Sequence, residues 1–336
     1  QGDGREYPDK TFGLWPAATN LITNGGGETN TTGWTVAILT ETITRITTQF
    51  KFGVASIEIV TPNLAAGEGA FHAFAGAAST QYTVSIWVRG AAGGTVYVSL
   101  WDNVTTFQNG TAVTLTGTWQ RISVTATTGV ASVTFRAYIR TNVQQGITFQ
   151  VDGLQVEAAA FATPYIETDG ATAARSAGRV QLPNPYNYIN ETQGAVAVLV
   201  RMGWTSTVGP SATPKIMRWN FGSATDTIYV FYFVAGAAWY ITLIRGGVST
   251  DAFIAGTFTS GDLALIVVAW DRTQVKIAVN GSAFTATANA GIPVVFSSGP
   301  FEVGSDNGAV DLLGGDFLAA AWFRASLTNA DSQTIN

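Results

Sequence analysis

Aromatic and arginine side chains recur at alternate positions in the first half of the chain, and these residue types can do binding chemistry. An aromatic ring offers a flat surface on which a sugar ring can stack, and a guanidinium donates several hydrogen bonds in a fixed geometry. We therefore predict a carbohydrate-binding face. Its candidate residues are Trp87, Arg89, Tyr97, Trp101, Arg136, Tyr138 and Arg140, with Arg121 on the same face. The same residue types concentrate in protein–protein interfaces, so an interface stays open as the alternative.

The elements that must position these side chains are β-strands. Apolar and polar residues alternate in the segments 82–89, 95–101, 121–126, 133–140 and 147–151. In the first of them Val84, Ile86 and Val88 share one face. Alternation over five to eight residues with many β-branched and aromatic residues is typical of half-buried strands. The aromatic and arginine residues then fall on the opposite, outward face.

The second half of the chain has the same alternating pattern. We predict strands over 194–201, 215–221, 227–234, 238–245, 263–270, 274–279 and 283–287. Asn280 and Gly281 separate two of these runs, which predicts a type I′ hairpin. A short helix is expected over 330–335, capped by Thr328 or Asn329. Both faces of 227–234 are apolar, and since monomers seldom expose such a stripe we expect burial against another domain or in a homo-oligomer.

Many short strands and almost no helix signal predict an all-β fold of two tandem antiparallel β-sandwiches. Residues 1–19 are expected to form an N-terminal extension, 20–160 the first sandwich, 161–185 a linker and 186–336 the second sandwich. A transmembrane β-barrel is the competing all-β interpretation, but the linker and the weak alternation in mid-chain disfavour it.

Composition excludes several classes of function. Charged residues make up 12% of the 336 residues and hydrophobic ones 46%, which argues against disorder. A net charge of −5 argues against nucleic acid as a partner. The longest apolar stretch, 229–244, is too short for a spanning helix, so no membrane insertion is expected. The sequence begins with Gln1, and we expect a processed chain or a piece of a longer one.

The sequence has few residues of the types and spacing that a catalytic site needs. The chain has no cysteine and one histidine, His72, which lies between Phe71 and Ala73 and is expected to be packed rather than catalytic. A glycosidase needs two carboxylates facing one cleft, yet Asp152 and Glu157 would point to opposite faces of an ideal strand. We therefore expect a protein that is not an enzyme.

Two segments resemble carbohydrate-binding modules found on cellulases and xylanases. NLITNGGGETNTTGW (20–34) is similar to the first strand of that family, and FQVDGLQVE (149–157) to its last. Gly27 stands where the family usually has Phe, which is a departure from the pattern. The resemblance implies a jelly roll over about 20–157. It also implies a structural calcium ion that clamps the first and last strands, with Glu28 and Asp152 at the matching positions.

Further segments resemble structural proteins of tailed bacteriophages. FATPYIETDGATAARSAG (161–178) is similar to a junction in these proteins, and the segments 186–200 and 301–335 look like the opening and the end of their concanavalin A-like, laminin-G-like sandwich. The resemblance implies a head fibre, a capsid decoration or a tail-associated protein on the exterior surface of the virion. Its partners would be other virion proteins and host or environmental glycans. Two alternatives remain: an extracellular carbohydrate-binding module pair from a larger secreted bacterial glycoside hydrolase, or a structural spacer without a ligand.

Overall fold

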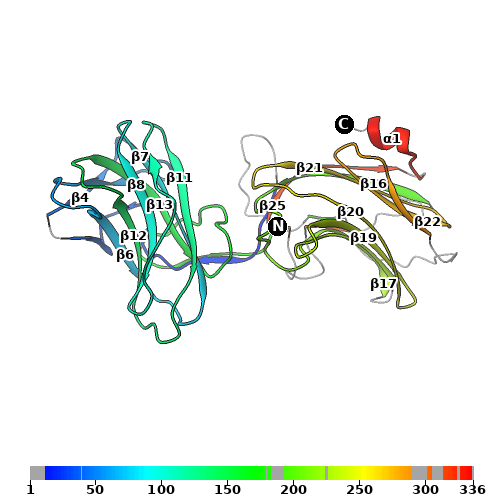
Figure 1. The fold of residues 1–336 in the computed structure, drawn as a ribbon, viewed down its shortest axis with the longest axis horizontal. Coiled ribbons are helices and arrows are strands. Elements are labelled where there is room, and N and C mark those ends of the chain that lie inside the picture. Colours follow the sequence, from blue (N-terminus) through cyan, green and yellow to red (C-terminus); the bar gives the residue numbers. More distant parts are fainter. Residues whose placement is uncertain are drawn as a thin grey trace. The chain divides into compact units, whose positions relative to one another are not determined.

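The computed structural model describes residues 12–38, 40–178, 180–182, 193–223, 226–288, 301–304, 313–323 and 326–334. The chain forms two units (Figure 1), and each is an antiparallel β-sandwich, which confirms the predicted fold class. The jelly-roll unit comprises Ala18–Arg175. The second unit comprises Gln1–Ala17 together with Ser176–Asn336.

The jelly-roll unit has two main sheets. The first has the order β10 (Val113–Thr114), β8 (Thr95–Asp102), β12 (Phe135–Thr141), β6 (Gly69–Phe74) and β3 (Trp34–Val36), and β9 (Thr106–Asn109) also pairs with β8. The other has the order β11 (Gln120–Thr127), β7 (Gln81–Gly90), β13 (Thr148–Glu157), β5 (Ser56–Val60) and β4 (Thr42–Ile46). A small ribbon joins β2 (Ala18–Asn20) to β14 (Ala173–Arg175).

The core of the jelly-roll unit lies between the two sheets, where the alternating apolar positions point inward. Val84, Ile86 and Val88 on β7 face Val98 and Leu100 on β8, and all are fully buried. His72 is also buried, with an edge-on ring contact to Trp34 at 6.1 Å, as expected of a packed histidine. Burial disfavours the charged imidazole and lowers the pKa of His72.

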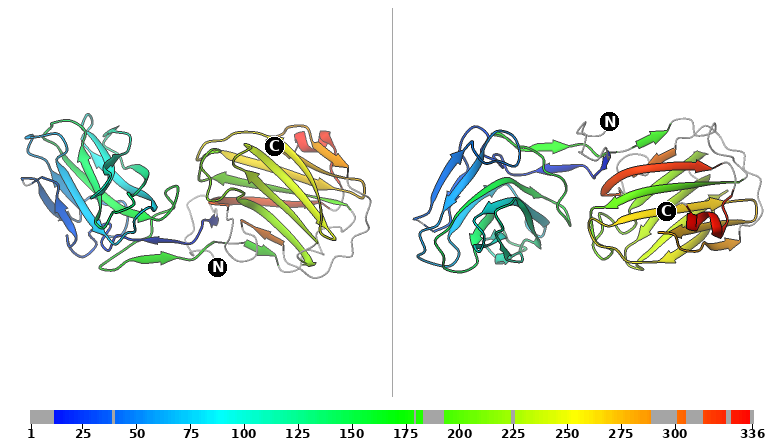
Figure 2. Two further views of the ribbon diagram at one scale, coloured as in Figure 1. Left: turned by 60° about the horizontal axis from the view of Figure 1, so that its bottom comes forward. Right: turned by 90° about the horizontal axis from the view of Figure 1, so that it is seen from above.

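The second unit also has two sheets, which Figure 2 shows from two further directions. One has the order β1 (Phe12–Leu14), β25 (Gly315–Phe323), β16 (Gly194–Met202), β21 (Leu263–Trp270), β22 (Gln274–Val279) and β23 (Thr285–Ala288). The other has the order β15 (Val180–Leu182), β24 (Phe301–Val303), β17 (Lys215–Ser223), β18 (Asp226–Phe233), β19 (Ala238–Arg245) and β20 (Val248–Ala255). The concanavalin A-like assignment of this sandwich stays a prediction.

Local signals in the second unit are confirmed. Asn280 and Gly281 both have positive φ, 50° and 72°, as a type I′ turn between β22 and β23 requires. The predicted helix is α1 (Asn329–Thr334). Thr328 caps it, because its hydroxyl accepts from the Asp331 backbone N–H at 3.4 Å while the Asp331 carboxylate accepts from the Thr328 N–H at 2.7 Å.

The boundaries of the units differ from the predicted ones. Residues 12–17, placed in an N-terminal extension, contribute β1 to the second unit, where Leu14 is 1% exposed. Residues 161–175, placed in the linker, pack into the jelly-roll unit and bury Thr163 and Tyr165. Prolines and weak alternation predict an extended linker, but hydrogen bonds such as those from the Thr163 N–H to Glu157 and from the Gly25 N–H to Thr168 hold this segment in the unit. Residues 183–192 of the predicted boundary lie outside the described residues.

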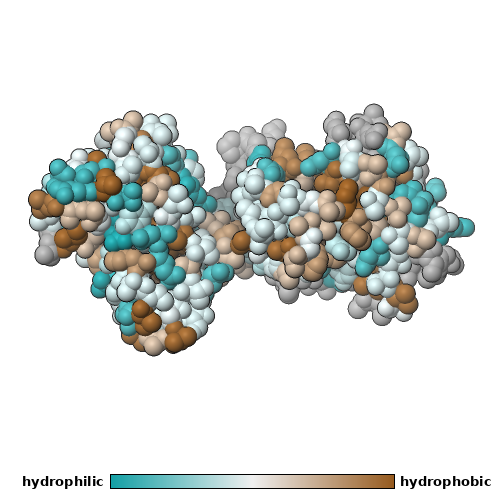
Figure 3. Space-filling view, viewed as in Figure 1, coloured by the Kyte–Doolittle hydropathy of each residue, from teal (hydrophilic) through white to brown (hydrophobic). Residues whose placement is uncertain are grey.

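The surface reflects the low charge of the chain. On the face seen in Figure 3, strongly hydrophilic residues form small separate groups among residues of intermediate hydropathy. Within the described ranges, no helix is both long and apolar enough to span a bilayer.

Candidate functional site

One outward face of the jelly-roll unit gathers five of the seven predicted binding residues. The register of β8 with β12 places Tyr97 opposite Arg140 and Trp101 opposite Arg136. Tyr138 lies between the two arginines and opposite Phe71 of β6. We call this set the arginine–aromatic face; it consists of Phe71, Tyr97, Trp101, Phe107, Arg136, Tyr138 and Arg140.

Arg136 is held between two rings. Its guanidinium lies 4.6 Å from the ring centroid of Phe71 and 4.8 Å from that of Trp101. β12 runs between β6 and β8, so the two rings approach the guanidinium from opposite sides. Its Nη1 donates to the Tyr138 hydroxyl at 3.2 Å. The side chain is thus fixed by cation–π contacts and one hydrogen bond.

Arg140 lies against three rings at the other end of the face. Its guanidinium is 3.6 Å from the centroid of Phe107, 5.2 Å from Tyr97 and 5.4 Å from Tyr138. Nη2 donates to the Asn109 side chain at 3.2 Å, and buried Nε has no partner. Burial lowers the pKa of this guanidinium, and the Tyr97 and Tyr138 hydroxyls oppose the shift.

The turn before β9 positions Phe107. Thr106 has a φ of 63°, a left-handed conformation that is uncommon for a threonine. The Asp102 carboxylate accepts hydrogen bonds from the N–H groups of Val104, Thr105 and Gly129. Burial favours the neutral acid, but these bonds and the Thr105 hydroxyl outweigh it and hold the pKa of Asp102 at about 2.

The other two candidate residues do not join this face. Trp87 and Arg89 lie on β7, which belongs to the opposite sheet, and so does Arg121 on β11. Arg89 Nε donates to the Gly117 carbonyl at 2.8 Å, in the segment that leads into the neighbouring strand β11. Trp87 lies under Lys51, whose Nζ is 4.4 Å from the ring centroid. The prediction that all these residues share one face is wrong. Strands with the same alternation of apolar and polar residues can belong to different sheets, and the alternation does not show which sheet a strand joins.

Sequence reasoning missed three residues of this region. Phe71 stood out only as a neighbour of His72, although its alternation within GAFHAF gave a usable signal. Phe107 and Asn109 come from β9, a strand of four residues whose pattern is too short to recognise. Phe107 is 39% exposed and packs on Arg140 and, edge-on, on Tyr138.

The two residues proposed for calcium do come together. A Cβ placed on Gly26 would lie 2.7 Å from Asp152 Oδ1 and 3.0 Å from Glu28 Oε1, so both oxygens face one point. Both atoms are buried and have no hydrogen-bond partner, whereas Asp152 Oδ2 accepts from the N–H groups of Lys51 and Phe52 and Glu28 Oε2 from that of Val54. Two unpartnered carboxylate oxygens aimed at one point fit a hard cation.

Burial shifts the pKa values of both carboxylates, Asp152 and Glu28. Burial raises the pKa of Asp152 to about 7, against the lowering effect of its backbone hydrogen bonds and with a further contribution from the Glu28 charge. Burial likewise raises the pKa of Glu28. Among the described residues no group of three or more His, Cys, Asp or Glu side chains could hold a metal ion, so the remaining ligands would be backbone oxygens or water.

The second unit carries an aromatic ladder on the outward face of β18, β19 and β20. Phe231 and Tyr240 stack with centroids 5.2 Å apart, and Tyr240 and Phe253 stack at 5.1 Å. Lys215 Nζ lies 4.7 Å from the Phe231 ring. Phe233 is 36% and Phe253 52% exposed, so this face, expected from the sequence to be buried, is open to solvent within the described chain.

A hollow of about 400 Å³ opens beside β20 in the second unit. Trp239 and Phe258 form its apolar wall, and Asp262 and Asn280 lie at its rim. The Asp262 carboxylate accepts from the Thr259 N–H, and the Asn280 carbonyl oxygen accepts from the Leu265 N–H. Asp262 therefore holds its own turn, and Asn280 joins the turn after β22 to β21.

No protein-family model matches the chain, and no curated protein sequence matches it. Solved structures align with it at low identity. The CBM22-1 and GH10 modules of Clostridium thermocellum endo-1,4-β-D-xylanase 10B, complexed with xylohexaose, align at 18% identity and a TM-score of 0.36 over 43% of this chain and 30% of that one. The chain thus matches less than a third of the xylanase modules' length.

Two other solved structures align with the chain at similar TM-scores but over very different shares of its length. The N-terminal tandem of family 22 carbohydrate-binding modules from a Paenibacillus barcinonensis xylanase aligns at 12% identity and a TM-score of 0.36, over 86% of this chain and 96% of that one. The enzymatically active domain of tailspike protein 4 of bacteriophage CBA120 aligns at 10% identity and 0.34, over 41% and 21%. At these identities the likeness concerns the β-sandwich fold alone.

Proposed function

We propose that the chain is a non-enzymatic glycan-binding protein whose arginine–aromatic face holds the saccharide. The observation that carries this is the convergence of five aromatic rings and two guanidinium groups on one outward sheet face. Trp101, Tyr97 and Phe71 are each partly exposed, so ring surface remains open for stacking.

The chemistry would combine stacking with directed hydrogen bonds. A sugar ring presents C–H groups on its faces, which pack on an aromatic ring, and hydroxyls at its edge, which accept from guanidinium N–H groups. The clamped arginines lose little side-chain freedom on binding, because their geometry is already fixed. Each contact is weak, so several copies on one surface would raise the overall affinity.

Substitution of Trp101 by Ala tests this proposal. We expect a loss of about tenfold or more in affinity across a glycan array, because stacking surface and the support of Arg136 are removed together. Trp87→Ala is the matched control, since it removes a tryptophan from the other sheet. Equal losses in the two variants, or unchanged binding by Trp101→Ala, would contradict the site.

A structural calcium ion is part of the same proposal. Glu28 Oε1 and Asp152 Oδ1 would hold it, and it would neutralise two buried carboxylates that otherwise repel each other. The ion would tie the segment around Gly26 to β13 and to the loop 51–54. This is a stabilising role at a distance from the arginine–aromatic face.

We further propose that the protein acts on the exterior of a bacteriophage virion, as a head fibre, capsid decoration or tail-associated protein. The motifs at 161–178, 186–200 and 301–335 support this. Immunogold electron microscopy of purified particles tests it, and label on the particle surface is expected. Particles without label and a secreted protein instead would favour the alternative of a carbohydrate-binding module pair from a glycoside hydrolase.

A further inference from the structure

The arginine–aromatic face carries two positive charges and no opposing carboxylate. The strand positions that face outward here, on β6, β8, β9 and β12, hold no Asp or Glu. Within the described residues no carboxylate forms an ion pair with Arg136 or Arg140. The nearby acidic residues Glu68 and Asp102 are buried and accept hydrogen bonds from backbone N–H groups of their own loops.

This arrangement is unusual in a chain of net charge −5. A buried or half-buried guanidinium normally gains a carboxylate partner, because desolvation of an unpaired charge is costly. Among the described residues, the aromatic rings and one oxygen each are the partners of these guanidinium groups. Arg140 donates to the Asn109 side chain and Arg136 to the Tyr138 hydroxyl. Burial lowers the pKa of Arg140, and no carboxylate offsets that effect.

The aromatic rings also set how the guanidinium groups are presented. The ring centroids of Phe71 and Trp101 lie 4.6 and 4.8 Å from the guanidinium carbon of Arg136, and its Nη1 donates to the Tyr138 hydroxyl. Arg140 packs on Phe107 at 3.6 Å, and its unpartnered Nε–H is buried, so a ligand reaches this guanidinium through its Nη groups. The N–H groups of a guanidinium lie in its plane, and its edge binds a carboxylate through two parallel hydrogen bonds.

We propose that the saccharide bound here is acidic, with ring carboxylates that pair with the edges of Arg136 and Arg140. This inference rests on the proposed glycan-binding function and names its ligand class. The two arginines are four residues apart on β12, which is roughly 13 Å along a strand. A polymer with carboxylates at intervals along its length, such as a polyuronate, can therefore engage both, whereas a single acidic monosaccharide reaches one.

A matched pair of polymers tests the ligand class. Polygalacturonate and its fully methyl-esterified form share one backbone and differ only in the carboxylate charge. We expect the full-length chain to bind polygalacturonate at least about tenfold more tightly by calorimetry. The preference is expected to weaken as salt is raised from 50 to 500 mM, because exposed charge pairs are screened.

Arg140→Lys and Arg136→Lys test the geometry, because lysine keeps the charge but lacks the planar fork. Each is expected to reduce the preference for the acid polymer about threefold or more. Arg272→Lys, at an exposed turn of the second unit, is the control and leaves the preference unchanged. Thermal unfolding confirms that each variant is folded, and Arg140→Gln or Arg136→Gln replaces the lysine variant of the same position that does not fold.

The outcomes separate the two proposals. Equal binding of both polymers, or tighter binding of the ester, overturns the acidic ligand class and leaves glycan binding intact. A second result also overturns the acidic ligand class and leaves glycan binding intact. In that case neither polymer binds, but a neutral glycan on an array does, and Trp101→Ala abolishes that binding. No binding of any glycan overturns both. An acid preference that survives Arg136→Lys and Arg140→Lys together also overturns the assignment to these two residues.

Discussion

Asp102 is a buried residue that holds one part of the candidate binding face in place. Its carboxylate fixes the turn that carries Thr106 in a left-handed conformation and so places Phe107 over Arg140. Charge-assisted hydrogen bonds to backbone N–H groups are among the stronger ones in proteins. The residue is therefore a positioning residue for the arginine–aromatic face.

We predict that Asp102→Asn destabilises the jelly-roll unit by about 1–3 kcal/mol at pH 7, because an amide accepts fewer of these bonds. The folded-state pKa, about 2, lies below the ordinary 3.8, so the ionised carboxylate stabilises the fold above pH 4. That contribution is lost as the pH falls from about 4 to 2. Urea unfolding of both proteins across this range checks it.

A stability difference between the two proteins that is as large at pH 2 as at pH 7 would contradict the assignment. Thr125→Ala is a suitable control, since its hydroxyl contacts Thr83 on the other sheet, away from the Asp102 turn.

Single residues also show what the sequence could not predict. Trp87 and Tyr97 stand in strands of the same alternating pattern, yet β7 and β8 belong to opposite sheets. Local alternation reports which side chains share a face of one strand and nothing of its distant partners. Glu28 and Asp152 are far apart in sequence, and only the resemblance to a known family paired them.

At the scale of elements, the carboxylate pair joins the segment before β3 to β13. β13 has an irregularity between Asp152 and Gln155, where Gly153 adopts a φ of 61°. The N–H groups of Lys51 and Phe52 and the backbone of Gly26 cover Asp152, so a side chain that regular alternation would expose is fully buried. The sequence pattern alone gave no sign of this bulge.

We predict that calcium raises the melting temperature of the wild-type protein and that chelation reverses the effect. Asp152→Asn is expected to abolish the calcium response. It should also make the calcium-free protein more stable, because a buried unpaired charge is removed. Differential scanning calorimetry with calcium and with a chelator measures both.

Glu58→Gln on β5, whose carboxylate accepts from Gln150 at 3.0 Å, is the control and should keep the full calcium response. Calcium stabilisation that persists in Asp152→Asn would show that the ion lies elsewhere.

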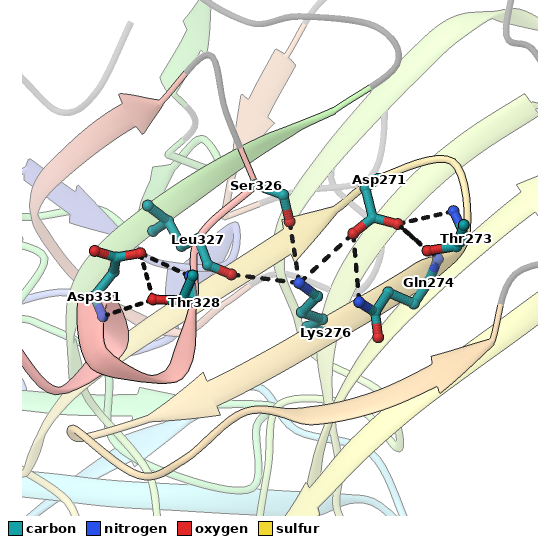
Figure 4. Close-up of polar contacts among 8 residues, drawn as sticks. All are labelled: Asp271, Thr273, Gln274, Lys276, Ser326, Leu327, Thr328 and Asp331. Carbon is teal, nitrogen blue, oxygen red and sulfur yellow. Dashed lines mark hydrogen bonds and ion pairs between the residues drawn. The ribbon is translucent and has the colours of Figure 1, made fainter.

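The C-terminal segment is a second element held by few polar contacts (Figure 4). Lys276 of β22 lies 3.6 Å from the Asp271 carboxylate, 3.3 Å from the Ser326 hydroxyl and 3.4 Å from the Leu327 carbonyl. Leu327 packs on the outer face of the sheet against Ala197, Val267 and Ala278. The lysine thus joins the segment before α1 to the sheet that it covers.

We predict that Lys276→Met increases hydrogen exchange in residues 326–334 about tenfold or more, because α1 is too short to persist without tertiary contacts. Asp271 retains its bonds from Thr273 and Gln274, so its turn should keep its protection. Mass spectrometry of peptic peptides resolves the two regions. Unchanged exchange in 326–334 would mean that other contacts hold the segment, such as the apolar contact of Leu327 and the hydrogen bond from the Phe284 N–H to Asn329.

Strand recognition from sequence succeeded where the alternation was long. The predicted segments 82–89 and 263–270 correspond to β7 and β21. β20 was missed because the apolar alternation in VSTDAFIA is weak, and among the described strands it pairs along one edge, with β19. Short or edge strands carry weak patterns, since few of their side chains are buried.

At the scale of the whole molecule, the aromatic ladder of the second unit is an uncharged surface at the edge of its sheet. The stack Phe231–Tyr240–Phe253 ends at β20, the edge strand of its sheet. Among the described strands, β20 has eight residues and no neighbour on its outer side, and an edge strand presents unpaired backbone groups there. Pairing of β20 with the β20 of a second copy would continue both the sheet and the stack.

We therefore predict self-association through this edge. Analytical ultracentrifugation should show a dimer at tens of micromolar, and Phe253→Lys should shift the equilibrium to monomer, because a charge replaces the exposed end of the stack. Val130→Lys is the control, as Val130 is 85% exposed in the jelly-roll unit. A wild-type protein that stays monomeric at these concentrations would contradict the prediction.

The pairing of β1 with β25 has a consequence for synthesis on the ribosome. Phe12 pairs with Phe317, and Trp15 Nε1 donates to Asp316 at 3.2 Å, so the first and last described strands of the chain lie side by side. The jelly-roll unit is inserted between them and can fold as soon as it emerges. β1 must wait for almost the entire chain, and during that time a nascent chain offers a free strand that a chaperone or a neighbouring nascent copy can capture.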